Sequence, residues 1–92
     1  MERREIRGLP YFPGVTSGTL RFGDVVPRPD RILVVTQMEV PTVQEGWGGV
    51  VVIEAALFSH AMIRILGLGV PTLIISEADA ESLENNMQVR YV

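Results

Sequence analysis

The chain has 92 residues, of which 47% are hydrophobic, and it carries a formal net charge of -3 and no cysteine. That length can bury one modest core, so we expect a single small domain over residues 1–92, standing alone or as a fragment of a longer chain. The composition excludes disulfides and thiolate metal sites. It also lacks a basic stripe for nucleic acid, an apolar run of the roughly 20 residues that span a bilayer, and a signal-peptide core. We therefore expect a cytoplasmic protein that binds neither nucleic acid nor membrane.

Short strands and helices are expected along most of the chain. The segment 15–26 predicts a hairpin or paired strands around two glycines, and 88–92 predicts a last strand. Apolar runs rich in β-branched residues at 32–35, 50–53 and 72–75 predict strands buried on both faces of a sheet. Helices are expected at 41–47, 60–68 and 78–84. Together these elements predict a mixed α/β domain.

The middle of the chain predicts a β-α-β unit. The runs 50–53 and 72–75 would be parallel strands joined by a right-handed crossover through the helix 60–68. That helix is apolar on nearly every face, so either the sheet and the N-terminal segment cover it, or part of it docks on a partner or on a second copy of the chain. The loop before it lies at the carboxyl end of a strand, where α/β proteins place ligands.

This loop ends in Ser59 and His60, the only histidine in the chain. Serine is a good N-cap, so the first helical N–H groups and the positive end of the helix dipole would lie beside the imidazole. Histidine is largely neutral and nucleophilic near physiological pH and can accept a phosphoryl group. The simpler alternative is a helix-terminal histidine that only satisfies a backbone group.

Three blocks of sequence, in the same order and at similar spacing, resemble the phosphohistidine swivelling domain of phosphoenolpyruvate-utilising enzymes. That family includes pyruvate phosphate dikinase, phosphoenolpyruvate synthase and enzyme I of the sugar phosphotransferase system. The blocks are an opening Gly-Leu-Pro-Tyr-Phe-Pro-Gly at 8–14 with Gly18, an apolar strand at 32–35 followed by Thr36, Gln37, Met38 and Glu39, and Ser59-His60-Ala61 with Ile63, Leu68, Gly69 and Pro71.

The resemblance implies a β/β/α swivelling fold with a partly parallel sheet. It implies that His60 is the phosphorylated residue, and that the phosphate is bound or supported by Ser59, Ala61, Met62, Thr36, Glu54 and Ala55. The donor would be phosphoenolpyruvate or ATP, and the acceptor a group such as pyruvate. The domain itself would bind no cofactor. A phosphotransferase domain or subunit that binds phosphoenolpyruvate or a nucleotide would be the partner and would hold Mg²⁺, and a homo-oligomer is a further possibility.

Some positions near His60 depart from the family pattern. Ala55 and Ala56 replace a glycine pair, Val52 replaces a threonine, Phe58 stands directly before the serine, and Leu66 replaces an arginine. These departures motivate an alternative, a binding or structural module that kept the fold and lost the transfer chemistry. A buried His60 would favour that alternative.

A weaker alternative is a hydrolase in which His60 has a glutamate, Glu39 or Glu54, as its base partner.

Overall fold

The computed structural model describes residues 4–23, 26–56 and 58–91, which form one curled, mixed sheet flanked by short helices. Its strands are β1 (Arg4–Ile6), β2 (Leu9–Phe12), β3 (Ser17–Phe22), β4 (Arg31–Thr36), β5 (Gly49–Ile53), β6 (Thr72–Ile75) and β7 (Gln88–Tyr91). The helices are the 3₁₀ helix η1 (Gln37–Thr42), α1 (His60–Leu66) and α2 (Glu77–Ala80). The chain is thus a small mixed α/β protein. Within the described residues, no helix is long and apolar enough to cross a membrane.

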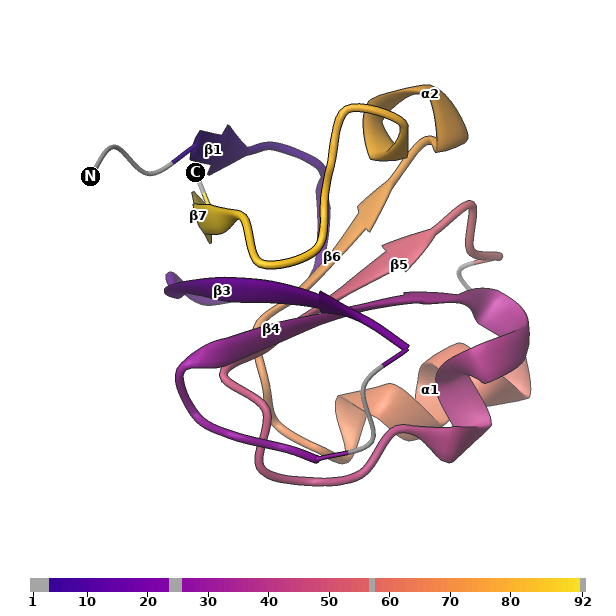
Figure 1. Ribbon diagram of the computed structural model, residues 1–92. Coiled ribbons are helices and arrows are strands. Elements are labelled where there is room, and N and C mark those ends of the chain that lie inside the picture. The colour runs from indigo at the N-terminus through magenta and orange to yellow at the C-terminus, as the bar shows by residue number, and fades with distance from the viewer. Residues whose placement is uncertain (1–3, 24–25, 57, 92) are drawn as a thin grey trace.

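The strand order is β1-β7-β3-β4-β5-β6-β2. The central strands β3, β4, β5 and β6 run parallel to one another, whereas β7 and β2 pair antiparallel to β3 and β6. The expected β-α-β unit is confirmed as β5-α1-β6, with Val50 opposite Thr72 and Ile53 opposite Ile75. The parallel strands therefore bring the ends of β4, β5 and β6 to one edge, which α1 and α2 flank (Figure 1).

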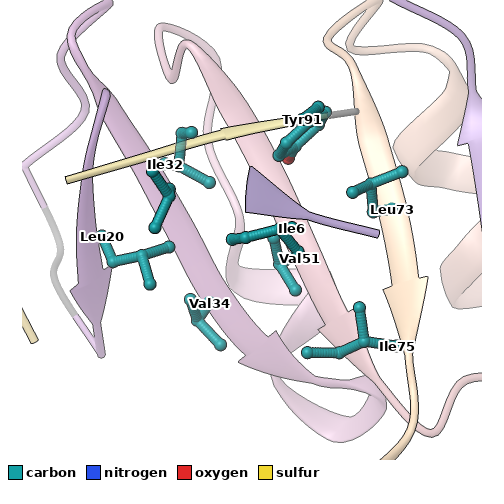
Figure 2. Packing of buried hydrophobic residues seen from close by; sticks show 9 residues of the cluster. Ile6, Leu20, Ile32, Val34, Val51, Leu73, Ile75 and Tyr91 are labelled. Carbon is teal, nitrogen blue, oxygen red and sulfur yellow. The ribbon is translucent and has the colours of Figure 1, made fainter. Parts of the chain in front are cut away.

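The strands β4, β5 and β6 are buried on both faces over most of their length, as their continuous apolar runs predict. Alternate residues point into two separate cores. The inner core, inside the curled sheet, consists of Ile6, Leu20, Ile32, Val34, Val51, Leu73, Ile75, Val89 and Tyr91. The outer core, on the side of α1 and η1, consists of Leu33, Val35, Val40, Val43, Trp47, Val50, Val52, Met62 and Ile65. Figure 2 shows the inner core, in which Ile6 from β1 lies over the same cluster as Val51 and Ile75.

Tyr91 closes one end of the inner core. Its buried hydroxyl donates to the Val50 carbonyl oxygen at 2.7 Å and lies 3.2 Å from the Pro71 carbonyl oxygen. Gly49 lies directly beside this ring, because a Cβ at that position would stand 2.8 Å from the Tyr91 hydroxyl oxygen and 2.9 Å from Cγ2 of Thr16. The last strand is therefore attached to β5 and to the segment that leads into β6.

Several expected elements differ from those observed. Among the described residues of 15–26 the chain forms one strand, β3, and its partners β4 and β7 begin later in the sequence, so these residues form no hairpin with one another. The helix expected at 41–47 begins and ends earlier, because Thr36 and Glu39 cap the preceding turn and place Pro41 inside η1. Likewise α2 starts directly after its cap Ser76 and ends at Ala80, and α1 ends at Leu66.

The strand expected at 88–92 is confirmed as β7, although Val92 lies outside the described residues. The edge strands β1 and β2 were not expected from the sequence.

Candidate functional site

His60 is the first residue of α1, and its side chain is exposed. The preceding Ser59 has an extended backbone and caps the helix, because its hydroxyl oxygen accepts a hydrogen bond from the Met62 N–H at 3.2 Å. The Ile63 N–H donates to the Ser59 carbonyl oxygen at 3.0 Å and closes the first turn. The predicted cap is therefore present, and it places the imidazole where a reactant from solvent can reach it.

The first turn of α1 offers limited hydrogen-bonding capacity to an anion. The N–H groups of His60 and Ala61 have no acceptor within the helix, as in any helical first turn. The Met62 N–H is already bonded to Ser59, and the Met62 side chain is fully buried in the outer core. Ala61 and Met62 were both expected to support a phosphate. Of their two backbone N–H groups, only that of Ala61 is therefore still available to an anion.

Thr36 ends β4 and serves as the cap of η1. Its backbone N–H and its hydroxyl both donate to Oε1 of Glu39, at 2.9 and 3.0 Å. This pair follows the capping-box pattern, in which the third helical residue bonds back to the N-cap. The hydroxyl expected to line a phosphate pocket is thus already paired, and so is the carboxylate of Glu39.

Glu54 follows β5 in a left-handed conformation, with a φ of 56°. That conformation costs a residue with a Cβ atom about 1 to 2 kcal/mol, because the Cβ lies close to the following carbonyl oxygen. Its carboxylate Oε1 accepts a hydrogen bond at 2.8 Å from the N–H of Glu77, the first residue of α2. Its own N–H donates to the Ile75 carbonyl oxygen at 2.9 Å. Glu54 therefore ties the end of β5 to the start of α2.

The loop that carries the site is also held by Gln37. The Oε1 atom of Gln37 accepts a hydrogen bond from the Ala56 N–H, which connects η1 to the segment before α1. Ala55 is half-buried and packs against the outer core. Ala55 and Ala56 therefore serve as packing and backbone contacts in this structure.

The expected site residues fall into two groups. Ser59, His60, Ala61 and Met62 form the start of α1, on the outer side of the sheet, where Ala55 also packs. Thr36 and Glu54 instead line an open groove of about 550 Å³ together with Gln37, Met38, Ile53, Glu77, Ala80 and Glu81. Ile53 and Ala80 pack against the inner core, so this groove lies on the α2 side of the strand ends. The groove lining does not include His60.

The charged residues near the site are engaged elsewhere. Arg64, one turn after His60, lies 3.4 Å from the carbonyl oxygens of both Val40 and Val43. The structure therefore pairs its guanidinium with the end of η1. Because Glu39 bonds to Thr36 and Glu54 bonds to the start of α2, the arrangement offers no support for either glutamate as a base partner of His60.

Two residues that position the loop were missed from the sequence, Gln37 and Glu77. Gln37 directly follows an expected strand end, and Ser76 followed three residues later by Asp79 is a capping pattern that could have located the start of α2. Their partners lie 19 and 23 residues away in the chain, so no local pattern connects them.

Within residues 4–23, 26–56 and 58–91, no group of three or more histidine, aspartate or glutamate side chains is placed to hold a metal ion. No protein-family model, curated protein or solved structure matches the chain. The resemblance to the swivelling domain therefore remains a prediction that depends on the three sequence blocks.

Proposed function

We propose that this domain has the swivelling fold and is a phosphoryl carrier, with an imidazole nitrogen of His60 as the accepting atom. The observation that carries the proposal is the exposure of the only histidine at the capped start of α1. The position follows β5, at the edge where the parallel strands end, which is where α/β proteins place ligands. A cytoplasmic location belongs to the same proposal and rests on the sequence expectations alone.

The transfer has two displacement steps. In the first, the lone pair of an imidazole nitrogen attacks phosphorus, an N–P bond forms, and the P–O bond to the donor breaks with its electron pair leaving on the donor oxygen. In the second, an oxygen of the acceptor attacks phosphorus and the N–P bond breaks, returning the pair to the imidazole. The first turn of α1 would favour the phosphate charge through the Ala61 N–H and the helix dipole.

The surroundings of His60 also fit a domain that works against a partner. Phe58 is 88% exposed and Ile63 is 52% exposed, and they stand two residues before and three residues after His60 in the chain. Exposed apolar side chains beside a reactive group favour contact with another protein surface. In α1, Met62 and Ile65 are buried whereas Ile63 and Leu66 are exposed, which supports a helix with one face left open to a partner. The partner in this proposal is a phosphotransferase domain or subunit that binds phosphoenolpyruvate or ATP and holds the metal.

The experiment treats the protein with phosphoramidate, a small donor that needs no partner, and follows it by phosphorus NMR and intact mass. We expect one acid-labile, base-stable phosphoryl adduct on the wild-type protein. His60→Gln should yield none while keeping the wild-type fluorescence of the buried Trp47, because residue 60 is exposed. An adduct that persists in His60→Gln, or a folded wild-type protein without an adduct, would refute the carrier.

A second candidate is the binding or structural module without transfer chemistry. The observation that favours it is the pairing of two expected helpers with other groups, Thr36 with Glu39 and Glu54 with Glu77. The nearby Arg64 is likewise paired with the end of η1. The phosphoramidate experiment separates the two candidates, because only the carrier forms the adduct.

A further inference from the structure

We infer that the groove between the end of β5 and α2 is a docking site for a basic segment of another protein, one that presents a lysine or arginine beside an apolar side chain. The groove is lined by Met38, Ile53, Ala80 and three glutamates, Glu54, Glu77 and Glu81. It does not include His60, so the inference stands apart from the transfer chemistry.

The apolar part of the groove is open to solvent. Met38 is 91% exposed, although it lies between residues that are held in place by hydrogen bonds. Ile53 and Ala80 are only partly buried and continue the inner core outward to the groove. The volume of about 550 Å³ lies within the range of roughly 300 to 1,000 Å³ that is usual for ligand pockets. An apolar side chain entering here would cover surface that the fold leaves uncovered.

The charge of the groove selects the occupant. Its charged lining residues are all carboxylates, and within the described residues neither Glu77 nor Glu81 forms an ion pair. Glu54 is fixed by its bond to the Glu77 N–H, so one negative group is already oriented before any partner arrives. These groups would repel an anionic segment and attract a cationic one.

Lysine and arginine side chains match both properties of this groove. Their methylene stems lie on apolar surface while their charged ends reach polar groups. The stem would cover Met38 and Ile53, and the charged end would meet the carboxylates of Glu77 and Glu81. A neighbouring apolar residue of the segment would lie against Ala80.

The test titrates the isotope-labelled protein with the capped tripeptide acetyl-Leu-Lys-Leu-amide and follows backbone amide shifts by NMR. The charge-reversed peptide acetyl-Leu-Glu-Leu-amide is the ligand control. Two variants are compared, Glu77→Gln/Glu81→Gln in the groove and Glu45→Gln/Glu84→Gln outside it, which change the net charge equally. Trp47 fluorescence verifies that both remain folded.

We expect saturable shifts at Thr36, Met38 and Ile53 with the lysine peptide only. Loss of two exposed ion pairs should weaken binding roughly fivefold in the groove variant, and the control variant should bind like the wild type. High salt should weaken the wild-type interaction as well. Three results would each overturn the inference: no saturable shift, equal binding of the glutamate peptide, or equal weakening in both variants. Concentration-dependent shifts of the same residues without peptide would assign the groove to a second copy of this chain and would also overturn it.

Discussion

Replacing Tyr91 by phenylalanine tests how Tyr91 closes the inner core. The change in the free energy of unfolding should depend on pH, because the hydroxyl of Tyr91 is buried in the structure. Burial raises the pKa of Tyr91 well above its ordinary value, because the phenolate would lose its hydration inside the core. In the unfolded chain a tyrosine titrates near pH 10. The folded state therefore keeps the phenolic proton over a pH range in which the unfolded state releases it.

The sign and size of the effect follow from proton linkage. The contribution of Tyr91 to stability is complete below about pH 10 and is lost as pH rises, at about 1.4 kcal/mol per pH unit once the unfolded tyrosine is ionised. At pH 7 the phenylalanine variant should be less stable by about 1 kcal/mol, the usual net value of one hydrogen bond. The stability curves of the wild type and the phenylalanine variant should cross between about pH 10.5 and 11. At that pH the stability that the wild type loses by proton linkage equals the stability that the variant lacks without the hydrogen bond.

The sequence makes this a clean measurement. The chain has no lysine and no cysteine, so only its two tyrosines change charge between about pH 9.5 and 12. Tyr11 is present in both proteins and cancels in the comparison. Urea denaturation followed by Trp47 fluorescence at pH 7, 9, 10 and 11 gives the free energies of unfolding. Parallel loss of stability in the two proteins from pH 9 to 11 would show that the Tyr91 phenol is not buried.

Two further predictions concern the loops at the candidate site. Ser59→Ala removes the bond to the Met62 N–H and should cost about 1 kcal/mol, which lowers Tm by roughly 4 to 8 °C in a thermal melt, while Ser59→Asp should keep most of the wild-type value. An unchanged Tm in Ser59→Ala would mean that the cap is not formed. Glu54→Gly and Glu54→Ala both remove the carboxylate, but only glycine adopts the left-handed backbone conformation without strain. In urea denaturation Glu54→Gly should therefore be about 1 kcal/mol more stable than Glu54→Ala. Equal stability of the two variants would contradict the left-handed conformation.

Local sequence patterns identified those parts of the site that depend on interactions between residues close together in the chain. Ser59 is a cap because its hydroxyl reaches an N–H three residues later, and His60 follows it as the first residue of α1. The phosphate-supporting roles expected for Thr36 and Glu54 stay predictions, and in the structure both side chains make other hydrogen bonds. Glu54 bonds to a residue 23 positions away, and no spacing rule within one loop reveals such a partner.

By itself, the sequence determined the three buried strands, the β-α-β unit and the capped histidine. Each of these depends on neighbours in the chain: continuous β-branched runs, turn residues, and a serine before an apolar helix. Only the tertiary structure decided that β3 lies between β4 and β7, that β1 and β2 form the two edges of the sheet, and that Thr36 and Glu54 share a groove apart from His60. Strand pairing and groove formation join residues that are distant in the chain, and their energies come from contacts that exist only once the sheet has formed.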